Sequence, residues 1–275
     1  MTGLLWSSAL VPALVMALIC AAAPAHAGTI SLTTWSEVTT DSDLGESLLT
    51  VHARNEGDEA ARNVQAHVEF AGEKYSGPKW EELRPGEEKS HQFELTKLPE
   101  NTGTYPIFMT VDFSDLNLYP FTALNVTAYQ VGEFTPRAKI FAKADSVELK
   151  KKGTFKVELS NTNDEPKSVT GRIMSPDEIQ INPANFTKEL GANENTTMEF
   201  ELNNLSAQPG ASYPLILVME YDKDGTHHYA QLVSQMSIAA GGIAQNDRNT
   251  IVYVALGVIG AIVLVEILRR SRAKS

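Results

Sequence analysis

The sequence predicts an all-β body made of two tandem β-sandwiches, followed by one C-terminal transmembrane helix. Two observations predict the body: short stretches in which apolar and polar residues alternate, and turn-forming residues between them. A third observation, an internal repeat, predicts that the two halves of the body share one fold. The apolar stretch 251–268 predicts the helix.

The repeat consists of three short patterns that return at a nearly constant offset. The paired segments are 49–55 with 155–161, 93–95 with 200–202, and 105–106 with 213–214, at offsets of 106, 107 and 108 residues. The stretches that begin at Tyr105 and Tyr213 alternate over nine residues. A period of two predicts strands with one buried face, whereas a helix would need a period of 3.6.

Composition and charge narrow the class of protein. The chain has 275 residues, of which 43% are hydrophobic and 21% charged, which is typical of a folded protein. The formal net charge of −11 argues against a nucleic-acid-binding protein, which needs a basic surface. The single cysteine, Cys20, lies in a segment that we expect to be removed, so the mature chain has neither disulfides nor a cysteine-based zinc site. This usage is typical of bacterial export.

The N-terminus resembles a secretory signal peptide covering residues 1–27. An apolar run is followed by Ala25 and Ala27, the small residues that signal peptidase accepts, so the mature chain is expected to begin at Gly28. The run is preceded by no Lys or Arg, and an uncleaved N-terminal anchor is the alternative interpretation.

The C-terminus carries the stronger membrane signal. The stretch 251–268 is apolar except for Glu266, and its 18 residues would span about 27 Å as a helix. A linker at 241–250 precedes it and a basic tail at 269–275 follows. The basic residues that flank the anchor are Arg269, Arg270, Arg272 and Lys274. Such a cluster stays in the cytoplasm, so we expect a single-pass protein with its body in the periplasm or on the cell surface. A sorting tail that is cut after export is the alternative.

The body resembles CARDB-like bacterial domains, which are immunoglobulin- or fibronectin-like β-sandwiches. The matching residues in the first half are Asn55, Gly57, the segment 83–87 (Leu-Arg-Pro-Gly-Glu), Phe93, Leu95, Gly103 and Tyr105. The second half departs from the pattern, since Leu190-Gly191-Ala192-Asn193 replaces the Pro-Gly turn. The resemblance implies two immunoglobulin-like domains, at 28–132 and 137–240, and it implies little about function.

A search for reactive groups yields no catalytic constellation, no cofactor motif and no strong metal site. Asp222, Asp224, His227 and His228 form the one cluster of metal-ligating residue types, which suggests a metal-dependent hydrolase as a hypothesis. However, adjacent histidines on a strand point to opposite faces. The competing interpretation is a polar hairpin that turns at Asp224-Gly225.

A glycan site is a second hypothesis. Trp80 follows Tyr75 and the Gly77-Pro78 pair, so a loop is expected there, and exposed aromatic rings on loops can stack on sugars. Packing of Trp80 and Tyr75 against the core is the competing interpretation.

These observations favour a non-enzymatic, membrane-anchored interaction or scaffold protein of the cell envelope. Its sandwiches would dock an envelope or membrane protein through a face or a sheet edge. The alternative function is a glycan-binding adhesin or an accessory protein for polysaccharide handling. The pattern leaves open whether the sandwiches pack together or hinge near residues 132–136.

Overall fold

The computed structural model of the protein describes residues 29–41, 46–132 and 137–240. All regular secondary structure in these residues is β-strand. Within them, no helix has the length and apolar character needed to cross a bilayer. The predicted signal peptide, linker, transmembrane span and basic tail lie outside the described residues.

The first half of the chain folds into two facing sheets. One sheet has the strand order β1-β2-β5, and the other has the order β4-β3-β6-β7. The strands are β1 (Leu32–Asp41), β2 (Glu46–Asn55), β3 (Ala61–Phe70), β4 (Glu73–Leu83), β5 (Glu88–Glu94), β6 (Gly103–Ser114) and β7 (Pro120–Val131). Leu49 and Val51 of β2 share one buried apolar cluster with Val68 of β3 and Ile107 of β6. This half is therefore a β-sandwich.

The second half repeats this arrangement. One sheet has the order β12-β14-β10-β8, and the other has the order β13-β11-β15-β16, with β9 pairing to β16. The strands are β8 (Ile140–Lys143), β9 (Val147–Leu149), β10 (Lys152–Asn161), β11 (Lys167–Met174), β12 (Ile179–Asn182), β13 (Asn185–Leu190), β14 (Asn195–Asn204), β15 (Ser212–Lys223) and β16 (Thr226–Ile238). A second cluster joins Phe155 and Phe200 of one sheet to Leu215 and Leu217 of the other.

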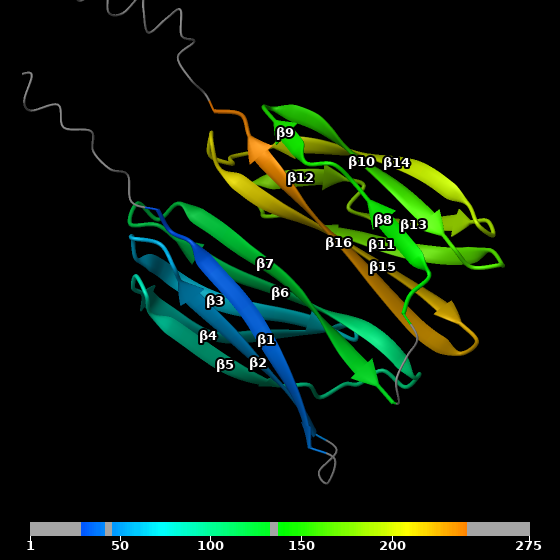
Figure 1. The fold of residues 1–275 in the computed structure, drawn as a ribbon. Coiled ribbons are helices and arrows are strands. Elements are labelled where there is room, and N and C mark those ends of the chain that lie inside the picture. Colours follow the sequence, from blue (N-terminus) through cyan, green and yellow to red (C-terminus); the bar gives the residue numbers. More distant parts are fainter. Residues whose placement is uncertain (1–28, 42–45, 133–136, 241–275) are drawn as a thin grey trace, which may run out of the picture.

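The all-β fold predicted from the sequence is confirmed for the described residues. The repeated patterns occupy equivalent strands, since β2, β5 and β6 correspond in place to β10, β14 and β15. Figure 1 shows the two sandwiches side by side, with the first in blue to green and the second in green to orange.

The expected loop around Trp80 is wrong, because residues 73–83 form strand β4. Gly77 and Pro78 indicated a turn, but β4 pairs only with β3 and ends the sheet order. An edge strand tolerates a proline because the N–H group that proline lacks is not needed for hydrogen bonds to a second neighbouring strand. The register of β3 against β4 shifts between Gln65 and His67, opposite this pair.

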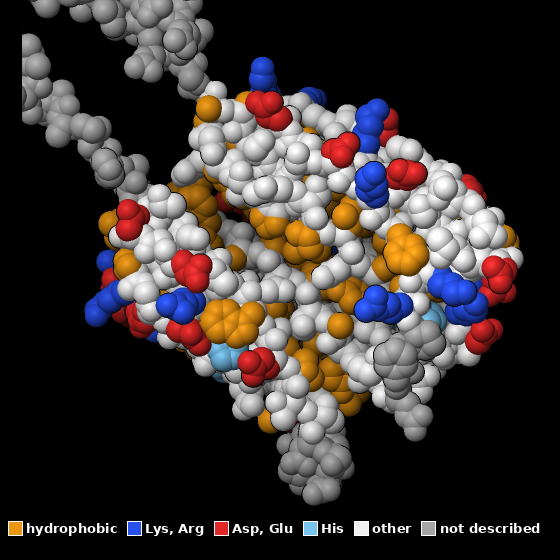
Figure 2. All heavy atoms as spheres, in the orientation of Figure 1, with side chains coloured by type: hydrophobic (Ala, Val, Ile, Leu, Met, Phe, Trp, Pro, Cys, Tyr) orange, Lys and Arg blue, Asp and Glu red, His pale blue; other side chains and the backbone are white. Residues whose placement is uncertain are grey.

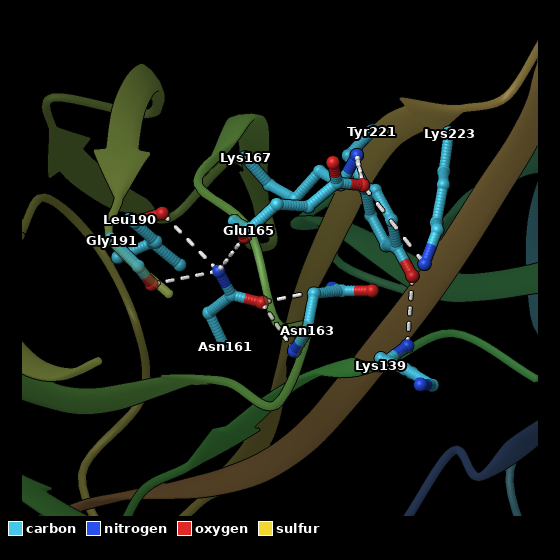
Figure 3. A network of polar contacts seen from close by, with 9 residues as sticks. All are labelled: Lys139, Asn161, Asn163, Glu165, Lys167, Leu190, Gly191, Tyr221 and Lys223. Atoms are coloured by element: carbon cyan, nitrogen blue, oxygen red, sulfur yellow. Dashed lines mark hydrogen bonds and ion pairs between the residues drawn. The ribbon is translucent and has the colours of Figure 1, made fainter. Parts of the chain in front are cut away.

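A buried asparagine ends β10 and holds the adjoining loops together. Asn161 is 1% exposed. Its Nδ2 donates hydrogen bonds to the carbonyl oxygens of Glu165 (3.0 Å), Leu190 (3.2 Å) and Gly191 (2.8 Å). Its Oδ1 accepts hydrogen bonds from the backbone N–H and the side-chain Nδ2 of Asn163, at 2.9 and 2.8 Å (Figure 3). One side chain therefore provides hydrogen bonds to backbone groups that could not otherwise form them with water.

The first sandwich uses the same device at the corresponding position. Asn55 is fully buried, and its Nδ2 donates to the carbonyl oxygens of Glu59 and Leu83 at 2.8 and 3.0 Å. The turns beside the two asparagines also match. The carboxylate of Glu87 accepts from the backbone N–H of Arg84, and that of Glu194 accepts from Gly191. The second copy has no Pro-Gly turn but has the same hydrogen-bond pattern.

We expect Asn161→Ala to destabilise the protein by about 2 kcal/mol, because it leaves buried carbonyl groups without donors. Thermal unfolding of the purified chain, followed by near-ultraviolet circular dichroism, measures the loss. The control is Asn101→Ala at an exposed position, where a change within about 0.5 kcal/mol is expected. Equal effects of the two substitutions would contradict the role of Asn161.

Candidate functional site: the interface and groove between the sandwiches

The two sandwiches pack against each other through the outer faces of their larger sheets. Ile216 and Val218 of β15 are 5% and 1% exposed, although they point away from the core of their own sandwich. They share a third apolar cluster with Val126 of β7 and with Phe108 of β6. Burying a side chain of this size contributes about 1.5–3 kcal/mol, so the contact holds the two units together.

Strand β15 departs from the expected single buried face for this reason. Residues 215–219 are buried without interruption, because the odd positions face the sandwich core and the even ones face the other sandwich. The sequence does contain this signal, since Leu-Ile-Leu-Val-Met at these positions is a continuous apolar run. Such runs are typical of strands covered on both faces.

An arginine crosses the interface beside this cluster. Nη1 and Nη2 of Arg172, on β11, bind Oε1 and Oε2 of Glu69, on β3, at 2.8 and 3.3 Å. The guanidinium carbon also lies 4.4 Å from the centroid of the Phe108 ring. Because the side chains of Arg172 and Glu69 are 36% and 32% exposed, the pair contributes about 1 kcal/mol at most. Its forked geometry orients the sandwiches more than it strengthens their contact.

A histidine forms a second contact across the interface, by ring stacking. The His227 ring, on β16, stacks on the Tyr105 ring, on β6, with centroids 4.2 Å apart and planes 5° apart. Its Nδ1 lies 2.9 Å from Oδ1 of Asp222 and its Nε2 lies 3.1 Å from Oε2 of Glu220. Burial by itself would lower the pKa of His227, but the hydrogen bonds to Glu220 and Asp222 outweigh it and raise the pKa.

Close backbone contact accompanies this stacking. The backbone N–H of His227 donates to the carbonyl oxygen of Thr102 at 2.9 Å, and His227 forms a parallel bridge with Gly103. This bridge joins the larger sheets of the two sandwiches. Gly103 has a φ of 147°, and a Cβ atom there would lie 2.3 Å from the carbonyl oxygen of His227. Only glycine allows this approach.

A groove of about 630 Å³ opens between the sandwiches next to Arg172. Its walls come from both units: Glu69, Phe70, Ala71, Gly72, Tyr105, Pro106, Phe108, Thr170, Gly171, Arg172, Asn185, Phe186, Thr187 and Glu220. The walls contain aromatic rings together with one cationic and two anionic side chains. The volume and the mixed chemistry suit a short peptide segment with apolar and charged side chains.

A second hollow, of about 660 Å³, lies between β7, the start of β1 and the start of β15. Figure 2 shows the face that carries β1 and β16, with hydrophobic side chains along the hollow between the sandwiches.

The aromatic residues of the glycan hypothesis lie in strand β4. Trp80 is half-buried and packs against the core of the first sandwich. Tyr75 is also half-buried, and its ring meets the Phe93 ring edge-on at 6.4 Å. Neither ring stands on an exposed loop, and neither lines the groove next to Arg172.

The strand geometry brings together only part of the cluster in the metal hypothesis, since Asp222 Oδ1 lies 2.9 Å from His227 Nδ1 while His228 lies apart from them. His227 stacks on Tyr105, whereas His228 points to the opposite face and stacks on Tyr221 at 5.0 Å. Asp224 has a φ of 51° and Gly225 a φ of 75°, so the two residues form the predicted hairpin turn. Within the described residues, no three His, Cys, Asp or Glu side chains converge as a metal site would require.

Sequence reasoning missed the residues that build the interface. Arg172, Glu69 and Phe108 lie on outer strand faces, where single charged or aromatic residues carry no pattern of their own. The continuous apolar run in β15 was the one usable sequence signal of the interface. It indicates that the outer face of this strand is covered, but it does not indicate which residues cover it.

Glu178 is a buried acid between β11 and β12. It is 3% exposed, and its two carboxylate oxygens bind no other residue. Burial raises the pKa of the Glu178 carboxyl; its own backbone amide opposes the shift, and the carboxylates of Asp177 and Asp112 add to it. Asp112 belongs to the first sandwich, so repulsion between its carboxylate and that of Glu178 also opposes the packing of the two sandwiches.

Comparisons with known proteins give only distant similarities. No protein-family model and no curated protein sequence matches the chain. A Salmonella α2-macroglobulin mutant is 9% identical, with a TM-score of 0.33, and the alignment covers 78% of this chain and 16% of that one. The Escherichia coli chaperone DraB is 11% identical, with a TM-score of 0.27, over 37% of this chain and 55% of that one. The human CEP192 PapD-like domain is 12% identical, with a TM-score of 0.27, over 41% of this chain and 93% of that one. At these scores none of them supports a functional inference about this chain.

We expect the stabilisation that His227 contributes to the folded protein to decrease as the pH rises. A raised pKa in the folded state means that protonated His227 stabilises the protein fully below its ordinary pKa of about 6.5. That contribution is lost as the pH rises through the folded-state pKa. Unfolding measured from pH 5 to 9 should show this decline in the natural protein and not in His227→Gln.

The matched control is His91→Gln, because His91 has no carboxylate partner among the described residues. It should keep the decline of the natural protein. A His227→Gln profile that parallels the natural one would contradict the assignment.

We expect Glu178→Gln to stabilise the protein at pH 7, by about 1 kcal/mol, because the neutral amide removes a buried charge. The sign follows from the raised pKa: the natural protein loses stability as the pH rises above the ordinary value of 4.5. The gain should therefore vanish near pH 4. Thermal unfolding at the two pH values measures it, with exposed Glu201→Gln as the control. A gain that persists at pH 4 would argue against the charge as its cause.

Proposed function

We propose that the chain is a membrane-anchored, non-enzymatic interaction protein of the cell envelope that docks a protein partner in the groove between its sandwiches. The groove beside Arg172 carries the proposal, because both units contribute to its walls and neither would present it alone. The interface contacts hold its walls in place before any partner arrives, which reduces the entropic cost of binding.

An exposed strand edge gives the partner a way to bind. Strand β13 pairs with β11 and ends the order of the larger sheet in the described residues. Its residues Asn185, Phe186 and Thr187 line the groove. An extended peptide can add to such an edge through backbone hydrogen bonds, with alternate side chains entering the groove. The partner in this proposal is therefore an extended segment of an envelope or membrane protein.

The anchoring part of the proposal rests on the sequence. The apolar stretch 251–268 and the basic residues after it support a C-terminal anchor with the sandwiches outside the cytoplasm. A cleaved signal at 1–27 supports the same orientation. A glycan-binding role remains the alternative function.

A substitution in the groove should abolish partner capture while leaving the fold intact. Thr170 is exposed on β11 and lines the groove, so the long charged side chain of Thr170→Arg would block it. Affinity capture of the tagged full chain from gently solubilised native membranes, followed by mass spectrometry, is the measurement. We expect a reproducible partner with the natural chain and at least a tenfold loss with Thr170→Arg, corresponding to about 1.4 kcal/mol.

The matched control is Thr154→Arg, an equally drastic change at an exposed threonine on β10, in the smaller sheet of the same sandwich. It should leave capture unchanged. Equal capture by both variants would rule out the groove as the docking site. An empty capture with the natural chain would favour the glycan alternative, which binding of the purified chain to a glycan array would then test.

A further inference from the structure

Three large apolar side chains stand exposed together at one end of the molecule. Leu116 and Leu118, in the turn between β6 and β7, are 58% and 69% exposed, and Leu205, in the loop between β14 and β15, is 63% exposed. The two loops belong to different sandwiches but touch, since the hydroxyl of Tyr119 donates a hydrogen bond to the carbonyl oxygen of Ser206. Clustered exposed leucines indicate a surface that is covered in the working protein.

Three lysines lie beside this apolar group. Lys150 and Lys151 are exposed in the turn between β9 and β10, and Lys152, the first residue of β10, is also exposed. Asn204 fixes this turn next to Leu205, because its backbone N–H donates to the carbonyl oxygen of Lys151 at 2.9 Å and its Nδ2 donates to that of Lys150 at 3.1 Å. The end therefore combines apolar side chains with a local positive charge, on a chain whose net charge is −11.

Both ends of the described chain leave the body here. Figure 1 shows that β1 begins and β16 ends on the side that carries the turns β6–β7 and β9–β10. The backbone N–H of Ala239 donates to the carbonyl oxygen of Leu149, directly before the lysines, at 2.9 Å. Ten residues, 241–250, separate the described chain from the predicted span, and they reach about 35 Å at most. An anchor at 251–268 would therefore hold this end close to the bilayer.

We infer that this end of the molecule docks on the surface of a lipid bilayer that contains anionic headgroups. The leucines enter the headgroup region, where apolar side chains gain by leaving water, and the lysines pair with lipid phosphates. The inference rests on the proposed anchoring and deepens it, because it fixes which end faces the membrane.

Two acidic residues of the first sandwich, Asp115 and Asp58, have structural roles at this end. Oδ1 of Asp115 accepts hydrogen bonds from the backbone N–H groups of Asn117 and Tyr119, both at 2.8 Å, and so shapes the turn that carries the leucines. Oδ1 of Asp58 accepts from the backbone N–H of Thr29 at 2.5 Å. The three lysines belong to the second sandwich, where they outnumber the two exposed acids nearby, Glu148 and Asp177, so this sandwich makes the charged contact with lipid.

Site-specific fluorescence in vesicles tests the inference with the full chain. Cys20 is the sole natural cysteine and lies in the predicted signal peptide, so a new cysteine gives a single label in the mature protein. Leu116→Cys and Leu205→Cys place an environment-sensitive dye at the proposed surface. Phe141→Cys, at a position 52% exposed, is the matched control. Phe141 pairs with Ser160, at the opposite end of β10 from Lys152.

We expect a blue shift and strong quenching by spin-labelled lipids at positions 116 and 205, and neither effect at 141. Equal signals at all three positions would overturn the inference. Flotation of the reconstituted protein after alkaline washing tests anchoring separately. A chain that fails to float refutes the proposed anchor, whereas one that floats without quenching at 116 and 205 refutes only the docking.

The charge contribution is tested with vesicles of phosphatidylcholine alone or mixed with phosphatidylglycerol. Replacing Lys150, Lys151 and Lys152 together by Glu should abolish the increase in quenching at position 205 that phosphatidylglycerol causes. The control replaces Lys74, Lys79 and Lys143, which are also exposed, and should keep that increase. Quenching that does not depend on phosphatidylglycerol in the natural chain would rule out the anionic headgroup as the partner of the lysines.

Discussion

The apolar outer face of strand β15 is the constraint on which the arrangement of the molecule depends. Ile216 and Val218 cannot remain in water without a loss of free energy, and the inner face of the same strand is already used by its own core. The first sandwich supplies the cover through Phe108 and Val126. Once the sheets meet there, their edges come close enough for the groove, the arginine pair and the histidine contact to form. Without this contact, only polar, stacking and backbone contacts would join the two sandwiches.

The polar contacts around that cluster determine orientation more than strength. Arg172 and Glu69 are each about one third exposed, so solvent screens their attraction. Their two parallel hydrogen bonds nevertheless accept only a narrow range of angles between the sandwiches. His227 adds a stacked ring and a close backbone approach that only Gly103 permits. The interface thus joins a non-directional apolar contact to directional polar ones, which is what a preformed binding groove needs.

Within each sandwich, a buried asparagine has the corresponding role. Asn55 and Asn161 donate hydrogen bonds to carbonyl groups from separate loops. In both copies, a glutamate carboxylate in the neighbouring turn also accepts a hydrogen bond from the backbone N–H three residues before it. The second copy forms these bonds without a Pro-Gly turn, so the bonds do not depend on that turn type. These hydrogen bonds hold in place the strands that carry the interface residues.

The sequence by itself determined the strand periodicity and the Asp224-Gly225 hairpin, because each depends on residues close together in the chain, and it also contained the internal repeat. It misplaced Trp80 in a loop, since local Gly and Pro signals cannot report that a strand lies at a sheet edge. Only the tertiary structure decided that Arg172 meets Glu69, that His227 meets Tyr105, and that the leucines and lysines gather at the end where the chain leaves the body. Arg172 and Glu69 are 103 residues apart in the chain, and no local pattern encodes contacts between outer faces of different domains.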